Sequence, residues 1–426
     1  MNVFKKITAF FVVTATFGLG SLAVSGQTGV PQQEKLLNGM KVLMWNDPKA
    51  DKVSLRVRVH AGSAFDPQGR EGLMQLLADS MFPNEAGREF FAEDLGGSLD
   101  VSTNYDYIEI SASSSPANFL TMLETVSTAV SNPQIDKETT GRVKAALMKR
   151  LETLESDPAY IADAAVASRL FGTFPYGRPQ LGTLQTVEKI GFADLIEARQ
   201  RFLTADNATL ALTGNFDRAL GFRAIRRYFG SWLKSDRRIP STFKQPEDPA
   251  NATLRLESPR SQTVEVRFAF RGAARADKEF AAASIYAAAL ESRIRSRVPE
   301  IHAKDVFVKN KAHILPGLIF IGFSAGSNEV GTGNGKVEAN GLVSKALSDP
   351  ITEAEFATAK RAVQTEWATK DVPTYWLDAD TYKIANPAAD IRAVESVTIA
   401  DVRAYADRAR TKPLASVIVA AKRPTD

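Results

Sequence analysis

Apolar and polar residues alternate along several short stretches of the chain, and this alternation predicts strands. In VSLRVRVH, residues 53–60, the apolar side chains fall on one face, and the Ser, Arg and His side chains fall on the other. The stretch VEVRFAFR, residues 264–271, has the same pattern, and each stretch ends close to a glycine. Both are typical of strands with one buried face. Between two short apolar segments, Asn38-Gly39 indicates a hairpin turn.

Elsewhere apolar residues recur every three or four positions, which is the spacing of an amphipathic helix. The stretch GLMQLLADSMF, residues 72–82, follows the first strand and places its leucines and Met81 on one face. Further helices are predicted over 118–132 and 136–155. Each half of the chain therefore mixes strands and helices, with helices concentrated in its middle.

Three features of the first half of the chain recur in the same order in the second half. A strand that ends at a glycine and leads into a helix recurs after 211 residues, and two shorter segments recur after 207 residues. The shorter pairs are IGFADL with VTIADV, at 190–195 and 397–402, and ATLALTG with ASVIVAA, at 208–214 and 415–421. Segments that recur in the same order and at nearly the same separation indicate duplication of a domain of about 200 residues.

We therefore predict an α+β fold of two homologous domains that face each other like a half-clam. Each domain is expected to be a mostly antiparallel sheet with helices packed on one face. The predicted N-terminal domain takes residues 26–234, and the C-terminal domain takes 252–426. Residues 235–251, SDRRIPSTFKQPEDPAN, are rich in proline and charge and are the predicted linker.

The N-terminal segment 1–25 has the pattern of a secretory signal peptide. Two lysines precede an apolar core, and Ala23 and Ser25 form an A-x-S motif. We expect cleavage there and no membrane span afterwards, because no later stretch reaches the ~18 uninterrupted apolar residues of a spanning helix. The expected location is the periplasm or the extracellular medium.

The amino-acid composition excludes several kinds of partner and site. The 426 residues carry a formal net charge of +4, which is too small to favour nucleic acid as a partner. The chain has no cysteine, which excludes disulfides, a thiolate nucleophile and a cysteine-liganded metal. Its histidines, His60, His302 and His313, form no i, i+4 pair, and we expect His60 to be exposed on the polar face of its strand.

Six motifs along the chain together resemble the pitrilysin/insulinase-type metallopeptidases, the superfamily that includes mitochondrial processing peptidase. The order of the motifs and the duplicated domain of matching size carry this resemblance. In chain order the motifs are LLNGMKVLMWND (36–47), HAGSAFDPQGREGLMQLLADSMF (60–82), LGGSLDVSTNYDYIEISAS (95–113), FPYGRPQLGT (174–183), LTADNATLALTGNFD (203–217) and DPITEAEFATAKRAV (349–363).

The resemblance implies a zinc site with His-x-x-Glu-His spacing. In such a site two histidines on one helix face bind zinc, the glutamate activates the zinc-bound water, and a downstream glutamate is the third ligand. At these positions this chain has Gln75, Ala78 and Asp79, and the third-ligand position falls at Arg150, with glutamates nearby. We therefore expect no catalytic residue and no metal ligand in this chain.

The family also places an Arg/Tyr pair in the second half, where it binds substrate near the zinc. Here Pro299 stands at the arginine position, and Val306 or Phe307 stands at the tyrosine position. Arg295 or Arg297 is a candidate replacement for the arginine. The resemblance therefore implies that both the zinc motif and the substrate pair are degenerate.

We interpret the chain as a non-catalytic peptidase-like subunit that pairs with an active zinc metallopeptidase and helps to form a peptide-binding chamber. Zinc is expected in the partner. Extended peptides would add to a sheet edge, with Gly97, Ser98, Ser102 and Thr103 as the candidate edge strand.

Two other interpretations remain open at this point. One is an active zinc endopeptidase with a divergent site built around Asp79, Glu152 and a histidine supplied by the fold. The other is a stand-alone peptide-binding or scaffold protein without a peptidase partner.

Overall fold

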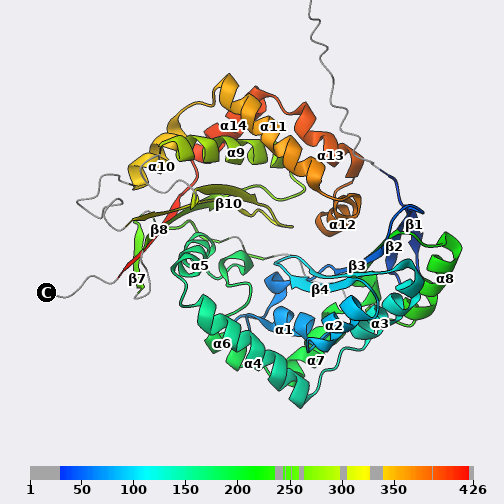
Figure 1. Ribbon diagram of the computed structural model, residues 1–426. Helices are drawn as coiled ribbons and strands as arrows, with labels where there is room; N and C mark the ends of the chain where they lie inside the picture. The colour runs from blue at the N-terminus through cyan, green and yellow to red at the C-terminus, as the bar shows by residue number, and fades with distance from the viewer. Residues whose placement is uncertain are drawn as a thin grey trace, which may run out of the picture.

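The computed structural model describes residues 29–235, 243–244, 246–250, 252–258, 263–297, 305–326, 339–385 and 387–421. The predicted signal peptide and part of the predicted linker lie outside these residues, so their boundaries stay predictions. The chain forms two halves, each with one sheet, and the two sheets face each other across the middle of the molecule (Figure 1).

The first sheet has six strands in the order β1-β2-β6-β3-β5-β4. Neighbouring strands are antiparallel except for β2 and β6, which are parallel. Its strands are β1 (Gln32–Lys35), β2 (Lys41–Asn46), β3 (Val53–Val59), β4 (Ser98–Thr103), β5 (Ile108–Ser114) and β6 (Ala208–Gly214).

The second sheet has five strands in the order β7-β11-β8-β10-β9, and again one neighbouring pair, β7 and β11, is parallel. Without β1, the first sheet has the same strand order and directions as the second. The predicted duplication is therefore confirmed at the level of topology. The strands are β7 (Leu254–Ser258), β8 (Thr263–Arg271), β9 (Phe307–Lys311), β10 (Leu318–Gly326) and β11 (Ala415–Ala421).

Helices cover the outer face of each sheet (Figure 1), and the α+β fold class is confirmed. The three helices predicted near residues 72–82, 118–132 and 136–155 are α1, α3 and α4. In the first half the helices are α1 (Leu73–Asp79), α2 (Ala86–Glu93), α3 (Phe119–Ser131), α4 (Lys137–Leu154), α5 (Pro158–Phe171), α6 (Leu184–Glu188), α7 (Phe192–Phe202) and α8 (Arg218–Phe229). In the second half they are α9 (Phe280–Arg297), α10 (Ala339–Ser348), α11 (Glu353–Thr369), α12 (Val372–Tyr382), α13 (Pro387–Ser396) and α14 (Ile399–Arg410). Short 3₁₀ turns are η1 (Ser63–Phe65), η2 (Pro116–Asn118), η3 (Pro175–Gly177) and η4 (Ala205–Asn207).

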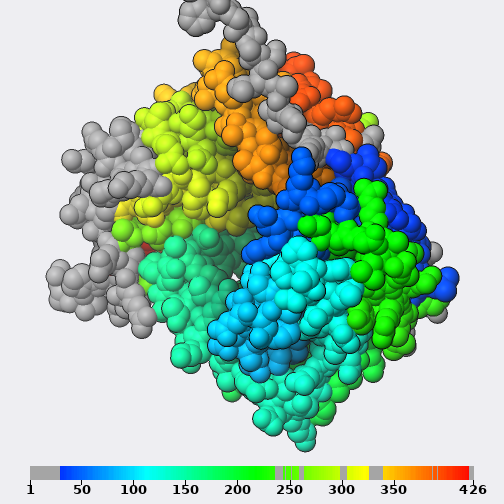
Figure 2. Space-filling view, turned by 45° about the vertical axis from the view of Figure 1, so that its right-hand side comes forward, coloured from blue at the N-terminus to red at the C-terminus, as the bar shows by residue number. Residues whose placement is uncertain are grey.

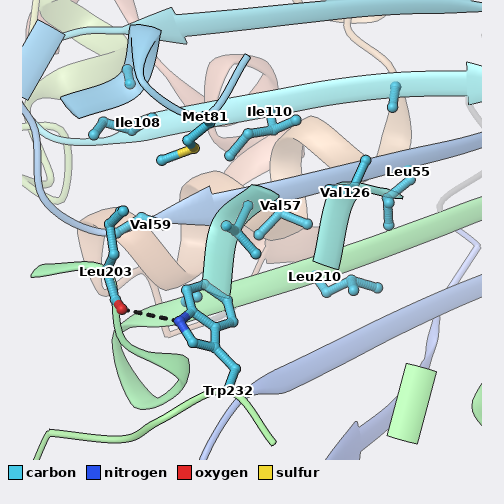
Figure 3. Packing of buried hydrophobic residues seen from close by; sticks show 14 of the residues in the cluster. Leu55, Val57, Val59, Met81, Ile108, Ile110, Val126, Leu203, Leu210 and Trp232 are labelled. Carbon is cyan, nitrogen blue, oxygen red and sulfur yellow. Dashed lines mark hydrogen bonds between the residues drawn. The ribbon is translucent and has the colours of Figure 1, made fainter. Parts of the chain in front are cut away.

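The apolar faces of the strands form the core of each half, as the alternation predicts. In the first half, Val57 of β3 and Ile110 of β5 are fully buried beneath the outer helices (Figure 3). Trp232 closes this core, and its indole Nε1 donates a hydrogen bond to the Leu203 carbonyl at 3.0 Å. This bond satisfies the one polar atom of a buried indole ring.

The inner, polar faces of the strands are also partly covered, because each half lends one helix to the other. Helix α5 of the first half packs on β8 and β11, and α12 of the second half packs against β6. His60 therefore is not exposed as expected: it contacts Thr209 and Thr381 between the halves, and burial lowers its pKa to about 3. Nearby Lys383, Arg58 and Lys41 act in the same direction.

Candidate functional site

A cavity of about 880 Å³ lies between the two halves. Both halves line it: α1, α4, β4 and α5 come from the first, and β9, the loop after it and the end of α12 come from the second. In Figure 2 the surface is hollowed between the teal helix α5 and the blue and cyan segments of the first half. Three of the four predicted zinc-site positions, Gln75, Asp79 and Arg150, line the cavity together with part of the predicted edge strand.

The backbone at the start of α1 is held firmly, which fixes the site positions on this helix. The Asp66 carboxylate accepts hydrogen bonds from the amides of Gly72 and Met74, both at 2.8 Å. Gly72 has φ +98°, and a Cβ there would meet the Leu181 carbonyl oxygen at 2.7 Å. A glycine is therefore required at this turn.

The first and third motif positions on α1 contact each other. Gln75 Nε2 donates to Asp79 Oδ1 at 2.8 Å, and both side chains line the cavity. Burial raises the pKa of Asp79, while the Gln75 hydrogen bond and the positive charges of Arg150 and Arg88 act in the opposite direction. Ala78, which is predicted to stand at the position of the family's catalytic glutamate, is fully buried in the apolar core.

These residues do not fit a zinc ion. A catalytic zinc site has three protein ligands from nitrogen, sulfur or carboxylate oxygen and one open position. Here one carboxylate, Asp79, is accompanied by an amide that already donates to it and by the guanidinium of Arg150 on the cavity wall. Among the described residues, no group of three His, Cys, Asp or Glu side chains is placed to hold a metal ion.

The glutamates near the third-ligand position face elsewhere. Glu155 accepts a hydrogen bond from the Leu184 amide at 3.0 Å, and Glu152 is exposed. Neither residue belongs to the cavity wall within the part of the chain that the structure describes. A divergent zinc site built on Asp79 and Glu152 therefore has no support in the geometry.

Of the predicted substrate-pair positions, the described Phe307 is not part of the cavity wall. Pro299 lies outside the described residues. The Phe307 ring packs on Phe320, with ring centres 5.0 Å apart. Arg295 pairs with Glu291 at 3.0 Å, and Arg297 pairs with Asp349. Neither arginine lines the cavity, and replacement of the family's substrate-binding arginine by one of them stays a prediction.

The second half instead presents Lys311 and His313 to the cavity, and sequence analysis did not single out either residue as a site residue. His313 Nδ1 lies 2.8 Å from Asp106 Oδ2, and Asp106 is 1% exposed. The Tyr176 hydroxyl also donates to Asp106, at 3.2 Å, and accepts from the Leu315 amide at 3.1 Å. The turn FPYGRP, residues 174–179, thus joins the halves. No local sequence pattern predicts the contact between Asp106 and His313, because 207 residues separate them.

Only the C-terminal part of the predicted edge strand lines the cavity. Strand β4 ends the first sheet, and Ser102 and Thr103 line the cavity. Gly97 precedes the strand, and Ser98 pairs with Ser113 through their hydroxyls at 2.9 Å. Gly97 and Ser98 are not part of the cavity wall.

Two sequence profiles of one peptidase family match the chain. Residues 41–184 match the profile described as "Insulinase (Peptidase family M16)". Residues 189–363 match the profile described as "Peptidase M16 inactive domain". The two matches follow each other along the chain and correspond to most of the first half and part of the second.

Curated relatives are distant, and each match covers only part of the relative. An "Uncharacterized zinc protease" of Rickettsia bellii is 22% identical over 208 residues, 48% of this chain and 50% of that protein. A "Probable mitochondrial-processing peptidase subunit beta" of Arabidopsis thaliana is 23% identical over 254 residues, 57% of this chain and 47% of that protein. The matches span about half the length of these relatives.

Solved structures match the fold over nearly the whole chain. A peptidase M16 inactive domain from Pseudomonas fluorescens has a TM-score of 0.80 at 19% identity, covering 93% of this chain and 99% of that one. The first half of the periplasmic protease PqqL from Escherichia coli has a TM-score of 0.70 at 14% identity, covering 92% of each chain. Within the described residues, none of the helices has both the length and the apolar character needed to cross a bilayer.

Proposed function

Because the chain belongs to the insulinase family of peptidases, peptidase family M16, we propose that it is a non-catalytic, peptidase-like subunit that binds extended peptide. The observation that carries this proposal is the pair Gln75–Asp79 on α1 with Arg150 on the same cavity wall. The side chains at these positions offer neither a zinc ligand set nor, at Ala78, a general base.

The cavity supports the peptide-binding part of the proposal. One of its walls is β4, the terminal strand of the first sheet. An extended peptide adds to such an edge through backbone hydrogen bonds, which give affinity without strict sequence preference. The match of residues 189–363 to the inactive-domain profile supports a role beside a catalytic partner, which would carry the zinc.

The partner and the location belong to the same proposal. A zinc-bearing homologue from the same cell would close the cavity with its own two domains and supply the water-activating metal. The signal pattern of residues 1–25 supports a location in the periplasm or outside the cell for this pair.

The experiment measures zinc content and peptidase activity of the purified mature chain, alone and mixed with a His-x-x-Glu-His homologue from the same cell. We expect no stoichiometric zinc and no activity alone, and a complex with enhanced activity in the mixture. One zinc per chain with chelator-sensitive activity alone would instead support the divergent endopeptidase. A folded chain that binds peptide but joins no peptidase would support a stand-alone binding protein.

A second experiment tests the positions themselves. The variant Q75H/A78E/D79H/R150E restores two imidazoles, a base and a carboxylate at the motif spacing, and it is expected to bind about one zinc per chain. Its matched control, Q75H/A78E/D79H, keeps the Arg150 guanidinium and is expected to bind zinc more weakly. Equal zinc binding by both variants would show that Arg150 is not at the third-ligand position.

A further inference from the structure

Two positive side chains on the cavity wall come from opposite halves of the molecule. Arg150 lies on α4 of the first half, and Lys311 is the last residue of β9 in the second half. Both residues are exposed, and both line the cavity. Each cation is therefore accessible to an anionic group that enters the cavity.

Neither cation is neutralised by an ion pair with the chain itself. In the ranges that the structure describes, no carboxylate lies within ion-pairing distance of Arg150 or Lys311. The charge of Arg150 acts on Asp79, but that carboxylate accepts a hydrogen bond from an amide side chain of its own helix. The charge of Asp163 acts on Lys311, but the Asp163 carboxylate contacts Arg267 of β8 at 2.6 Å. The carboxylates that act on the two cations thus already have other partners.

Helix α5 shows that the two cations act on one part of the cavity wall. Tyr160 and Asp163 are one turn apart on α5, and both line the cavity. Burial raises the pKa of Tyr160, Glu155 acts in the same direction, and the positive charge of Arg150 opposes the rise. The surrounding protein atoms lower the pKa of Lys311, and the negative charge of Asp163 opposes this shift. Because residues three apart lie on one side of a helix, Arg150 and Lys311 act on neighbouring turns of the same helix face.

This face of α5 leaves room for a bound group. Ala164 and Ala167 continue it at helical spacing and line the cavity with small side chains. The Lys311 Nζ lies over the Phe320 ring, 4.2 Å from its centre, and this contact holds the ammonium at the wall. A cation that is held in place loses less conformational entropy when it binds an anion.

We propose that Arg150 and Lys311 bind a carboxylate of the peptide that enters the cavity, so that the chain prefers acidic peptide segments. This inference rests on the proposed function and names the class of peptide that the cavity binds. A guanidinium can donate two parallel hydrogen bonds to one carboxylate, and an ammonium donates up to three. The carboxylate belongs to an Asp or Glu side chain of the peptide or to its C-terminus, which offer the same chemistry.

The residue type at the predicted third-ligand position agrees with this proposal. The family resemblance implies a zinc-binding glutamate there, and this chain has Arg150 instead. The substitution reverses the charge at that position. A group that binds a metal cation is thereby replaced by a group that binds an anion.

Variants of the two cations have matched controls in neighbouring residues. Arg150→Gln and Lys311→Gln each remove one positive charge, and Arg150→Lys keeps it. Lys149→Gln and Lys309→Gln are the controls, because both lysines are exposed, lie on α4 and β9, and are not part of the cavity wall. Asp100→Asn removes an exposed negative charge from the same wall.

The probes are synthetic peptides of about 15 residues, long enough to span the cavity as extended chains. Each is built from serine, glutamine, leucine and valine, carries an uncharged dye and has blocked ends. One peptide has three central glutamates, a second has three glutamines there, and a third has three lysines. A fourth keeps the glutamines but ends in a free carboxylate. Fluorescence anisotropy measures their affinity for the full-length mature protein.

We expect the glutamate peptide to bind more tightly than the glutamine peptide, and the lysine peptide to bind most weakly. Binding of the glutamate peptide should weaken about three- to tenfold in Arg150→Gln and in Lys311→Gln, and by less at about 0.5 M salt. Arg150→Lys, Asp100→Asn and both lysine controls should keep most of the binding. Tighter binding of the fourth peptide than of the blocked glutamine peptide would show that a C-terminal carboxylate also occupies the site. The Tm of every variant should stay the same, because the changed side chains are exposed.

The outcomes separate this inference from the proposed function. If the unaltered chain binds none of the peptides, the proposed function fails and this inference with it. If it binds all four peptides equally well, this inference alone fails. Equal weakening by Lys149→Gln or Lys309→Gln would show that general surface charge attracts the peptide, and would overturn the site. Equal loss in Arg150→Lys and Arg150→Gln would show that the charge at this position does not matter, which would also overturn it.

Discussion

Helices α5 and α12 occupy equivalent places in the duplicated fold but are held in different ways. Each crosses from its own half to the inner face of the other half's sheet. Each also begins with a proline in its first turn and an aspartate N-cap, Asp157 or Asp371, which accepts a backbone amide. Helix α5 presents an apolar face that packs on apolar residues of β8 and β11. Helix α12 is held by ion pairs to β2 and β3, beside a small apolar cluster around Leu377.

This difference shows that one duplicated fold forms two kinds of contact between its halves. They are called here the α5 joint and the α12 joint, after the helix that crosses to the other half. Apolar burial is non-directional and depends little on pH or salt. Buried ion pairs require exact partners and respond to the loss of either one. Helix α5 also carries one ion pair, between Asp163 and the buried Arg267 of β8 at 2.6 Å. We therefore expect the α5 joint to depend mainly on packing volume and the α12 joint mainly on charge, and the predictions below test that division.

The largest expected effect is at the buried arginine of the α12 joint. Arg58 is 2% exposed and contacts Glu109 at 2.7 Å and Asp378 at 2.8 Å. Arg58→Ala leaves two carboxylates facing each other without a cation, and the expected loss is ~3–5 kcal/mol in the free energy of unfolding. Urea unfolding monitored by circular dichroism measures it. Arg58→Ala combined with Asp378→Ala should recover part of this loss, and no recovery would contradict the ion-pair account.

A smaller loss is expected at the apolar joint. Leu170 of α5 is 1% exposed and belongs to the cluster that includes Val417 of β11. Leu170→Ala is expected to cost ~2–4 kcal/mol, because it removes buried methyl groups and leaves a cavity. The cost should be the same at low and high salt in urea unfolding. A cost that changes strongly with salt would show that the α5 joint is not controlled by packing.

The α12 joint should weaken in acid through His60. Its pKa is lowered by burial to about 3, whereas the unfolded chain takes up the proton near pH 6.5. The unfolded state therefore binds more protons between these values, so stability is fully present above about pH 6.5 and is lost as pH falls. The slope from this one group is at most about 1.4 kcal/mol per pH unit.

The matched control for this pH dependence is His60→Gln, which keeps hydrogen-bonding capacity but does not titrate. The measurement is the difference in unfolding free energy between the two proteins from pH 7 to about pH 5. Other groups that titrate in this range, such as the buried Asp66 with a pKa raised to about 7, are present in both proteins and cancel in the difference. We expect the unaltered chain to lose more stability than the variant. Parallel pH curves would show that His60 does not control the joint.

The smallest effect is expected at the partly exposed pair of the same joint. Lys41 lies 2.7 Å from Asp380, and their side chains are 34% and 21% exposed. Lys41→Ala is expected to cost about 0–1 kcal/mol, since water and salt screen such a pair. The difference should vanish at about 1 M salt, where the Debye length is about 3 Å. A larger, salt-resistant cost would place this pair with Arg58 among the buried contacts.

Much of the fold follows from local patterns that the sequence contains. Alternation at 53–60 and 264–271 corresponds to β3 and β8, which occupy equivalent positions in the two sheets. Of the segments that recur after 207 residues, one pair corresponds to α7 and α14 and the other to β6 and β11. Such patterns are readable because the period of a strand or helix is set within a few residues.

Only part of the candidate site could be predicted from the sequence. Gln75, Ala78 and Asp79 were found because the helix places them at a fixed spacing, and the structure puts Gln75 and Asp79 on the cavity wall and Ala78 in the core. Strand β4 is the terminal strand of the first sheet, and Ser102 and Thr103 line the cavity whereas Gly97 and Ser98 do not. That a peptide adds to this strand stays a prediction.

By itself, the sequence determined the α+β class, the duplication, and the residue types at the predicted zinc-site positions, because each of these depends on residue type and on spacing along the chain. Only the tertiary structure decided what meets across the two halves. The polar face of β3 could be read as solvent-facing until α12 was seen to cover His60 and Arg58. The contact between Asp106 and His313 likewise spans 207 residues of chain. Contacts at that separation are set by how two sheets pack, and no local period encodes them.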